Sequence, residues 1–266
     1  MRKLMDELGM EPIFYFRGMP RELSRRPDSR DYRKFPPKDW REWAEYVKFW
    51  VREAKRWGFR YYEVWNEPVP WAYWLGTLEE AATLHKVTYE AIKSVQPEAV
   101  VMGPCPYSVR LLDFLRELFD MGVYDHLDAL SVHGYCRTPE EFGAWLRKIK
   151  ALMRRYGPEK PIYVTELGWH APSPWVGAPY PMLSEADQAN YLVRSYVIAK
   201  AEGVKVLIWH MFWDWNDKKL RGGHGILRYN GQPKPALVAL ANLVPLLSGA
   251  RVLSDVRGLP EGARGY

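Results

Sequence analysis

Short apolar runs alternate with longer amphipathic segments along almost the whole sequence, and this alternation limits the fold more than any other feature. Six runs have the length and composition of strands: residues 12–16, 61–65, 99–102, 127–133, 161–165 and 204–209. Strands that alternate with helices are typical of repeated βα units and a parallel sheet. We therefore predict an α/β protein with six readable βα strands, and 266 residues are enough for a TIM-type (β/α) barrel.

The segments between these runs carry helix start signals. Thr77 with Glu80 and Thr138 with Glu141 form capping-box patterns, and Ser184 is a further cap. Helices are expected over residues 38–54, 77–95, 111–121, 139–156, 184–201 and 235–247. Since no linker or repeat interrupts this pattern, we predict one partial barrel domain over residues 1–249. The tail, residues 250–266, is rich in glycine and is either irregular or the start of a truncated β-rich accessory domain.

Charge and hydropathy argue against several classes of partner. The net charge is +6, but the basic residues are interspersed with acidic ones, which is typical of solvated helix faces and not of a nucleic-acid surface. An acidic polysaccharide remains compatible with this charge. No apolar run approaches the ~20 residues of a membrane span. The first residues lack the apolar stretch of a signal peptide, and the sequence does not identify a cell compartment.

Metal and cofactor motifs are not found. The sequence contains no His-Glu-x-x-His, no Cys-x-x-Cys and no phosphate-cradling glycine loop, so we expect no metal and no cofactor. The two cysteines, Cys105 and Cys136, fit no metal-ligand spacing. They are either two free thiols or, because both follow the ends of neighbouring predicted strands, a disulfide pair.

Two predicted strands lead into a glutamate. One reads Tyr-Tyr-Glu-Val-Trp-Asn-Glu-Pro over residues 61–68, and the other reads Ile-Tyr-Val-Thr-Glu-Leu-Gly-Trp over residues 162–169. A single glutamate at a loop start is most often a surface ion pair. Two of them, each among aromatic residues at a strand's C-terminal end, favour glycosidic bond cleavage, which needs one carboxyl as proton donor and one carboxylate as nucleophile. The 13 Trp and 17 Tyr also suit sugar stacking.

Trp-Asn-Glu-Pro at one strand end and Thr-Glu-Leu-Gly-Trp three strands later resemble the large clan of retaining (β/α)8 glycoside hydrolases. Within it the chain most resembles glycoside hydrolase family 39, which includes β-xylosidases, iduronidases and bacterial exopolysaccharide hydrolases. Residues 73–77, 103–104, 225–227 and 234–237 add to the likeness. The resemblance implies a retaining hydrolase that acts on a β-linked glycan.

The resemblance also assigns roles. Glu67 is the expected acid/base, Glu166 the expected nucleophile, and Asn66 the expected partner of the sugar 2-hydroxyl. His133 and Tyr135 are expected to orient the nucleophile. The candidate aromatic contacts to the substrate are Trp169, Trp209 and Trp213, together with Phe212.

The other histidines have two possible roles. His170, His210 and His224 are either substrate contacts or loop packing, whereas His85 and His126 are expected to be structural. Arg17 is either a substrate contact or part of a loop ion pair.

The chain differs from this family in strand number. The family's acid/base lies on the fourth of eight strands, and Glu67 follows the second readable strand, so the family's first two strands have no counterpart here. Three outcomes are open: a fragment of a longer protein, an open partial barrel, or closure by a second copy. We expect self-association through the exposed barrel edges, because unpaired parallel edges invite pairing.

Three functions remain open from the sequence. The first is a retaining glycosidase, acting on small glycosides or on an exopolysaccharide, in exo or endo fashion. The second is a carbohydrate-binding barrel fragment that is weakly active or inactive. The third is a structural module, which leaves the paired glutamates unexplained.

Overall fold

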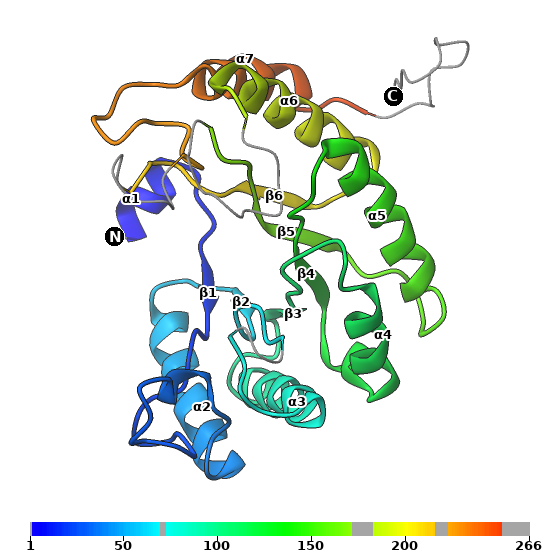
Figure 1. The fold of residues 1–266 in the computed structure, drawn as a ribbon. Coiled ribbons are helices and arrows are strands. Elements are labelled where there is room, and N and C mark those ends of the chain that lie inside the picture. Colours follow the sequence, from blue (N-terminus) through cyan, green and yellow to red (C-terminus); the bar gives the residue numbers. More distant parts are fainter. Residues whose placement is uncertain (1, 70–72, 172–182, 216–222, 252–266) are drawn as a thin grey trace. The chain divides into compact units, whose positions relative to one another are not determined.

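Six parallel strands follow one another in chain order, and helices connect them in the βα manner that the sequence predicts (Figure 1). The computed structural model describes residues 2–69, 73–171, 183–215 and 223–251. The chain forms two compact units. Unit 1 comprises Met1–Val132 and Leu152–Pro161, and unit 2 comprises His133–Ala151 and Ile162–Tyr266. The predicted class, a partial (β/α) barrel fold with six strands, is confirmed.

Unit 1 is built on four strands. They are β1 (Ile13–Tyr15), β2 (Tyr61–Glu63), β3 (Val100–Pro104) and β4 (Ala129–His133, whose last residue belongs to unit 2). The registers place Ile13 beside Tyr61, Tyr61 beside Val100, and Met102 beside Ala129. The helical segments are α1 (Arg2–Glu7), η1 (Tyr32–Lys34), α2 (Trp40–Arg56), α3 (Leu78–Val95), α4 (Leu112–Asp120) and η2 (Val123–His126).

Helices α2 and α3 begin at side-chain caps and pack side by side in unit 1 (Figure 1). The Asp39 carboxylate accepts from the Arg41 N–H at the start of α2, and Thr77 forms the predicted capping box with Glu80 at the start of α3. Helix α2 buries one stripe, Trp43, Val47, Val51 and Ala54. Each fully buried large apolar side chain contributes roughly 1.5–3 kcal/mol, so this stripe is what attaches the helix to the unit.

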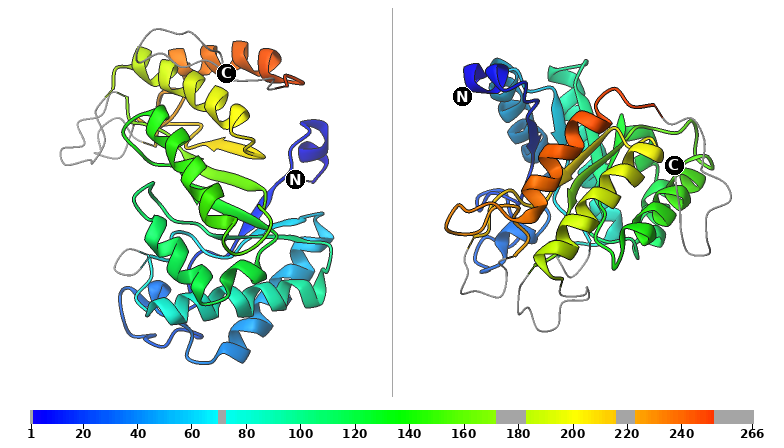
Figure 2. Two further views of the ribbon diagram at one scale, coloured as in Figure 1. Left: turned by 90° about the vertical axis from the view of Figure 1, so that its right-hand side faces the viewer. Right: turned by 90° about the horizontal axis from the view of Figure 1, so that it is seen from above.

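Unit 2 contains β5 (Ile162–Leu167) and β6 (Val206–Trp209), with α5 (Pro139–Met153, whose last two residues belong to unit 1), α6 (Glu185–Ala201) and α7 (Pro235–Leu247). Helices α6 and α7 lie side by side (Figure 2). Ser184 caps α6 through a capping box with Asp187. The register places Tyr163 beside Val206 and Leu167 beside Trp209, and it shifts between Val164 and Leu167. Such an irregularity next to Glu166 re-aims the side chains at the strand end.

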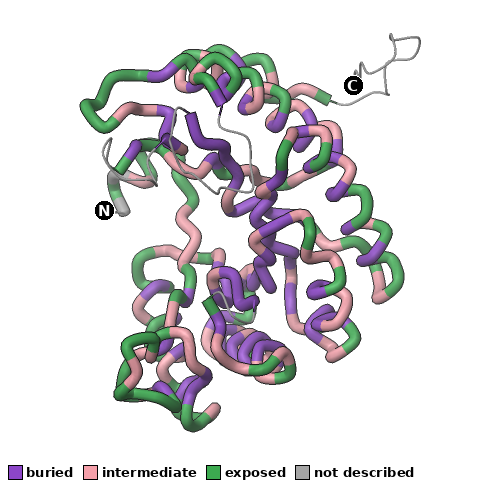
Figure 3. The backbone as a smooth tube through the Cα atoms, viewed as in Figure 1, coloured by how far each residue is buried: buried purple, intermediate pink, exposed green. Residues whose placement is uncertain are grey.

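Burial follows the strands in both units, where the tube of Figure 3 is mostly purple in β2 to β5. Cys105 and Cys136 are both free and buried, so the free-thiol alternative is confirmed and the disulfide is not formed. Burial raises the pKa of the Cys136 thiol, which keeps it protonated and unreactive. Among the described helices, none combines the length and apolarity that a membrane crossing requires. The tail predicted for residues 250–266 lies outside the described residues from position 252 onward.

Candidate active site

Glu166 lies near the C-terminal end of β5 and is held by three side chains of unit 2. The Tyr135 hydroxyl donates to Oε2 of Glu166 at 2.9 Å. His133 Nδ1 lies 3.5 Å from the same oxygen, and His210 Nε2 lies 3.9 Å from it. The Glu166 side chain is 27% exposed, so solvent or a substrate reaches a carboxylate whose orientation is already fixed.

Neighbouring strand ends place these groups. His133 ends β4 and Tyr135 comes two residues later, and residues two apart in an extended chain project to the same side. The backbone N–H of Gly134 between them donates to the Glu166 carbonyl at 3.0 Å, which fixes this segment against β5. A Cβ at Gly134 would lie 2.8 Å from the Phe142 ring, so only glycine allows this approach.

His210 reaches Glu166 from the residue that follows β6. Its N–H donates to the Leu167 carbonyl at 2.8 Å, which continues the pairing of β5 with β6. The two backbones approach so closely that a Cβ at Gly168 would lie 2.1 Å from the His210 carbonyl oxygen. Gly168, within the Thr-Glu-Leu-Gly-Trp motif, is therefore a packing requirement of this site.

A histidine cluster borders the Glu166 group. The ring of His224 lies 3.5 Å from that of His170 and 5.6 Å from that of His210, centroid to centroid. Tyr135 packs its ring edge against both His210 and His224. Burial, together with the neighbouring His170, His210 and Lys234, lowers the pKa of His224 to about 2. His224 is thus neutral near pH 7 and brings no charge to the carboxylate.

A buried ion pair between Lys234 and Asp214 fastens the loops that carry this cluster. The Lys234 ammonium, at the N-cap of α7, lies 2.7 Å from Oδ2 of Asp214 and donates to the Ala171 carbonyl at 2.8 Å. The other Asp214 oxygen accepts the N–H groups of Gly223 and Gly225, at 2.9 and 2.7 Å. Both charges are almost fully buried, so each depends on the other for compensation.

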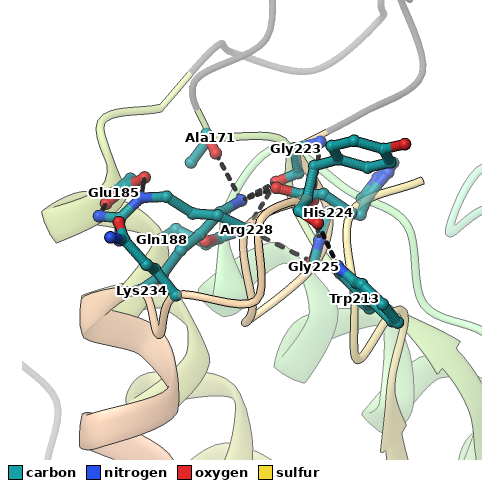
Figure 4. Close-up of polar contacts among 12 residues, drawn as sticks. Ala171, Glu185, Gln188, Trp213, Gly223, His224, Gly225, Arg228 and Lys234 are labelled. Atoms are coloured by element: carbon teal, nitrogen blue, oxygen red, sulfur yellow. Dashed lines mark hydrogen bonds and ion pairs between the residues drawn. The ribbon is translucent and has the colours of Figure 1, made fainter. Parts of the chain in front are cut away.

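Gln188 of α6 joins the same network. Its amide donates to the Trp169 carbonyl at 2.7 Å and to the Gly223 carbonyl at 2.9 Å. On the outer side of these loops, Arg228 pairs with Glu185 through two hydrogen bonds (Figure 4). The segments after β5 and after β6 are therefore connected to the starts of both α6 and α7.

The tryptophans proposed as substrate contacts lie in two different settings. Trp169 and Trp209 are buried, with ring centroids 5.9 Å apart, and their indole N–H groups donate to the carbonyls of Cys136 and His224. Trp213 is 53% exposed, and its N–H donates to the Tyr229 carbonyl at 3.1 Å. Trp213 presents an open ring face, whereas Trp169 and Trp209 pack in the wall behind the histidine cluster.

Glu67 lies in unit 1, four residues beyond the end of β2. Its backbone φ is +51°, in the left-handed region that residues other than glycine rarely occupy. The Val69 N–H donates to the Glu67 carbonyl at 2.6 Å, which closes the turn, and Glu67 itself is buried. Such strained residues cluster at functional sites, where surrounding packing holds a side chain in one direction.

A packed tryptophan, Trp65, immediately precedes the residues of this turn. Trp65 is buried, packs edge-on against Trp74 at 5.5 Å, and donates its indole N–H to the Tyr73 carbonyl at 3.2 Å. Asn66, between Trp65 and Glu67, is half-buried. The turn that carries Glu67 thus follows directly on a packed aromatic cluster.

Three further candidates from the sequence, His85, His126 and Arg17, lie in unit 1. His85 is buried in α3 and shares a hydrogen bond with the His126 carbonyl at 3.0 Å, as a structural histidine does. His126 itself contacts the Gly122 carbonyl through Nδ1 at 2.9 Å. Arg17, just after β1, is exposed.

Sequence reasoning missed three residues of the site: Lys234, Asp214 and Gln188. Asp214 stands between two tryptophans, and an acidic residue in so aromatic a run is an available signal for a buried partner. Its partner lies 20 positions further on, at the start of α7, and no local pattern connects the two.

Comparison with known proteins decides the family. The sequence profile of the glycosyl hydrolases family 39 matches residues 2–261. The chain belongs to glycosyl hydrolases family 39. Beta-xylosidases from Caldicellulosiruptor saccharolyticus and Geobacillus stearothermophilus are each 26% identical to it. These alignments cover 92% and 87% of this chain but 55% and 52% of the relatives, so the chain spans about half the length of the curated relatives it matches.

Solved structures of family 39 show the same fold. A family 39 glycoside hydrolase from the gut symbiont Bacteroides cellulosilyticus superposes with a TM-score of 0.76 at 21% identity, over 97% of this chain and 55% of that one. A monomeric beta-xylosidase from Caulobacter crescentus superposes with a TM-score of 0.64 at 20% identity, over 90% and 54%. The βα pattern read from the sequence thus corresponds to the fold of these family 39 enzymes.

Proposed function

We propose that this family 39 chain carries the catalytic residues of a retaining glycoside hydrolase that cleaves a β-linked glycan, with Glu166 as nucleophile and Glu67 as acid/base. The observation that carries the proposal is the Glu166 carboxylate at a strand end, with Oε2 held by the Tyr135 hydroxyl at 2.9 Å. A carboxylate fixed through one oxygen leaves the other oxygen in a defined direction for attack.

In the first step Glu166 attacks the anomeric carbon while Glu67 donates its proton to the leaving glycosidic oxygen. The C–O bond to the leaving group breaks, and a glycosyl ester forms on Glu166. In the second step Glu67 removes a proton from water, whose oxygen displaces Glu166 from the anomeric carbon. Two inversions retain the β configuration, and this chemistry requires the two carboxyl groups to come within ~5–5.5 Å of one another.

The remaining site residues support these two steps. Asn66, next to Glu67, is proposed to hydrogen bond the sugar 2-hydroxyl, an interaction that strengthens in an oxocarbenium-like transition state. Tyr135 and His133 keep the nucleophile oriented, as their contacts to Oε2 indicate. Trp209 and Trp169 support the wall behind the histidine cluster, and Trp213 contacts the substrate.

The substrate class follows from the relatives and stays a proposal. Because the two curated relatives are beta-xylosidases, a β-xyloside is the first candidate, with an exopolysaccharide as the alternative. A second function, a carbohydrate-binding protein of little activity, is kept because the aromatic residues of unit 2 serve binding as well as turnover.

Self-association is the proposed partner interaction. Strands β1 and β6 are the first and last in the strand order, and each carries an exposed apolar residue, Tyr15 at 45% and Ile208 at 40%. Open strand edges of this kind pair with other chains. Sedimentation at micromolar concentration tests this, and a monomer there contradicts it.

The decisive experiment assays aryl β-glycosides with wild type, Glu166→Ala and a control, Glu45→Ala, whose glutamate is exposed on α2. Loss of turnover in Glu166→Ala alone, with azide restoring reaction as a glycosyl azide of inverted configuration, supports the proposal, because azide replaces the nucleophile in a single displacement. The sugar that reacts identifies the glycone. A folded wild type that turns over no aryl glycoside and no polysaccharide favours the binding protein instead.

A further inference from the structure

A basic loop, residues 17–38, connects β1 to α2 in unit 1. It contains eight basic and three acidic residues, a net charge of +5, whereas the whole chain carries +6. Charge of one sign concentrated in one segment attracts a partner of the opposite sign. We infer that this loop is a binding surface for acidic glycans, which holds carboxylate groups on sugar units other than the one that reacts. The inference rests on the proposed function and extends it to the charge of the substrate.

Most of the positive charge of the basic loop is not neutralised within unit 1. All six of its arginines are exposed, and five form no ion pair with a described acidic residue: Arg17, Arg21, Arg26, Arg30 and Arg33. The other basic residues have acidic partners: Arg25 with Glu80, Lys34 with Asp31, and Lys38 with Glu42. The residues of unit 1 outside the described ranges, Met1 and 70–72, include no acidic side chain. Five guanidinium groups therefore remain for an anionic ligand.

Aromatic rings hold several of these guanidinium groups in place. Arg21 lies over the Tyr32 ring at 4.0 Å to its centroid, and Arg33 lies over the same ring at 5.5 Å. Arg33 Nε also donates to the Tyr32 hydroxyl at 3.0 Å, and Arg26 lies over the Phe35 ring at 5.8 Å. A guanidinium group stacked in this way presents a planar fork of N–H groups, which matches the two oxygens of a carboxylate.

The backbone of the basic loop is fixed before any ligand binds. The Met19 N–H donates to the Arg33 carbonyl at 2.8 Å, and the hydroxyl of the buried Ser24 donates to the Tyr32 carbonyl at 2.7 Å. Ser24 also forms an antiparallel bridge with Pro37. These contacts close the loop on itself. Because less conformational entropy is then lost on binding, a preorganised surface of this kind binds an extended chain more tightly.

The basic loop adjoins the turn that carries Glu67 in the same unit. It follows β1, and Glu67 follows β2, which pairs with β1 in parallel, so both lie at the C-terminal edge of these strands. The Lys34 carbonyl accepts the Leu75 N–H at 2.8 Å, and the Tyr73 carbonyl accepts the Trp65 indole N–H at 3.2 Å. A glycan longer than the unit that reacts at Glu67 can therefore extend onto the loop.

Two observations favour a glycan over other polyanions. Proteins that bind single-stranded nucleic acids stack the bases on open aromatic rings, and the Tyr32 ring is already covered by Arg21. Three acidic residues lie within the loop: Glu22, Asp28 and Asp31. They repel the closely spaced phosphates of a nucleic acid, whereas carboxylates spaced along a sugar chain can contact the arginines between them.

The test measures glycan binding by the full chain in a Glu166→Gln background, which is expected to stop turnover. Titration calorimetry uses glucuronoxylan, alginate and hyaluronan, each beside the same polymer with its carboxyl groups reduced to primary alcohols. We expect at least one acidic polymer to bind with a Kd about tenfold below that of its reduced counterpart. Added salt should raise the Kd of the acidic polymer and leave that of the reduced polymer unchanged, because exposed charges are screened.

Paired substitutions separate the loop from the charge of the whole chain. Arg21→Gln with Arg33→Gln should raise the Kd of the acidic polymer about tenfold. Arg21→Lys with Arg33→Lys should restore part of the affinity, since the charge remains and the planar fork is lost. The control, Arg52→Gln with Arg56→Gln, removes the same charge from two exposed positions near the end of α2 that is remote from the loop, and it should leave the Kd unchanged.

A second loop pair and a kinetic readout complete the test. Circular dichroism and Tm establish that each variant folds, and Arg26→Gln with Arg30→Gln carries the test if the first pair does not fold. This second pair should raise the Kd by a similar factor. With an intact Glu166, either loop pair should lower kcat/KM for the acidic polymer about tenfold relative to kcat/KM for its reduced counterpart.

The inference is overturned if no acidic glycan binds the folded protein more tightly than its reduced counterpart, or if the loop variants raise the Kd no more than the control. It is also overturned if duplex DNA or phosphatidylserine vesicles bind more tightly than every acidic glycan and lose this binding in the loop variants. Hydrolysis of neutral aryl glycosides without binding of acidic glycans leaves the proposed function intact and overturns the binding surface alone. Loop-dependent binding of an acidic glycan without any turnover contradicts the hydrolase and supports the binding surface.

Discussion

The two glutamates occupy opposite kinds of surroundings. Glu166 lies within β5, where the register with β6 shifts, and its side chain is fixed by polar groups, Tyr135 first among them. Glu67 lies beyond its strand in a left-handed turn, two residues after Trp65, which packs against Trp74. The Glu166 carboxylate is oriented by a hydrogen bond to its side chain, whereas the backbone at Glu67 is held in a strained conformation. Residues of one type in such different environments are suited to different roles, one as nucleophile and one as proton donor.

The largest expected effect separates these roles. Glu67→Gln should lower kcat/KM about 10²- to 10⁴-fold for glycosides with poor leaving groups, because a general acid is lost, and much less for glycosides with activated leaving groups. A series of aryl glycosides of graded leaving-group pKa measures this dependence. An equal loss of kcat/KM across the series contradicts a proton-donor role for Glu67.

The second effect concerns how unit 2 holds its site. Lys234→Met should lower the free energy of unfolding by about 3–5 kcal/mol, because it leaves the Asp214 carboxylate buried and uncompensated. Lys48→Met is the matched control, since Lys48 pairs with Glu45 at the surface of unit 1 and should contribute less than about 1 kcal/mol. Urea unfolding measures both. If Lys234→Met and Lys48→Met lower the free energy of unfolding by similar amounts, the buried pair does not stabilise the loops of the site.

A third effect is smaller and specific to Glu166. Tyr135→Phe removes one hydrogen bond to a charged group, an interaction of about 1.5–3 kcal/mol, so kcat should fall roughly 10- to 100-fold. The folded state should be little changed, since the ring remains. Unaltered kcat in a folded Tyr135→Phe shows that the nucleophile is oriented by other groups.

The pH dependence of stability adds a test of both units. Burial lowers the pKa of His85 in unit 1 to about 3, so the folded state excludes a proton that the unfolded state binds below about pH 6.5. The contribution of neutral His85 to the free energy of unfolding is then fully present above pH 6.5. It falls by about 1.4 kcal/mol per pH unit as the pH drops toward 3. His224 acts in the same direction in unit 2. Chemical unfolding at pH 7 and pH 5 should show less loss for His85→Gln than for wild type, and an equal loss removes His85 as a cause.

The smallest expected effect is on stability, and it tests the backbone strain at Glu67. Glu67→Gly should be more stable than Glu67→Ala by about 1 kcal/mol, because glycine adopts φ +51° without strain. At position 166, within β5, the order should reverse, since glycine weakens a strand. Thermal unfolding of the four variants gives both differences. The same order at both positions means that the backbone at Glu67 is not strained in solution.

The sequence predicted the elements and the motifs because both depend on local patterns. The structure confirms the alternation of strands and helices, the Thr77 and Ser184 caps and the free-cysteine alternative. The family resemblance also predicts that Tyr135 lies beside Glu166, and the structure brings the two together. Helix ends were predicted less well: the helix expected over residues 38–54 is Trp40–Arg56, and α5 ends at Met153, three residues before the expected Tyr156.

Other features depend on contacts that no local pattern encodes. The φ of +51° at Glu67 opposes the usual preference of a residue before proline for extended backbone. The burial of Trp169 and the exposure of Trp215 are set by tertiary packing, and both look alike in the sequence. The pairing of Asp214 with Lys234 joins two loops across 20 positions. The fold and the candidate nucleophile can thus be predicted from local sequence patterns, whereas the surfaces that select a substrate cannot.

The most direct test of the central claim is to trap the glycosyl ester. A 2-deoxy-2-fluoro β-glycoside of the reactive sugar, with an activated leaving group, slows both steps but forms the ester faster than water removes it. Mass spectrometry of the digested protein should then find one added fluoroglycosyl group, and fragmentation should place it on Glu166. Labelling of Glu67 or of another residue contradicts the account, and so does hydrolysis with inverted product and no label at all.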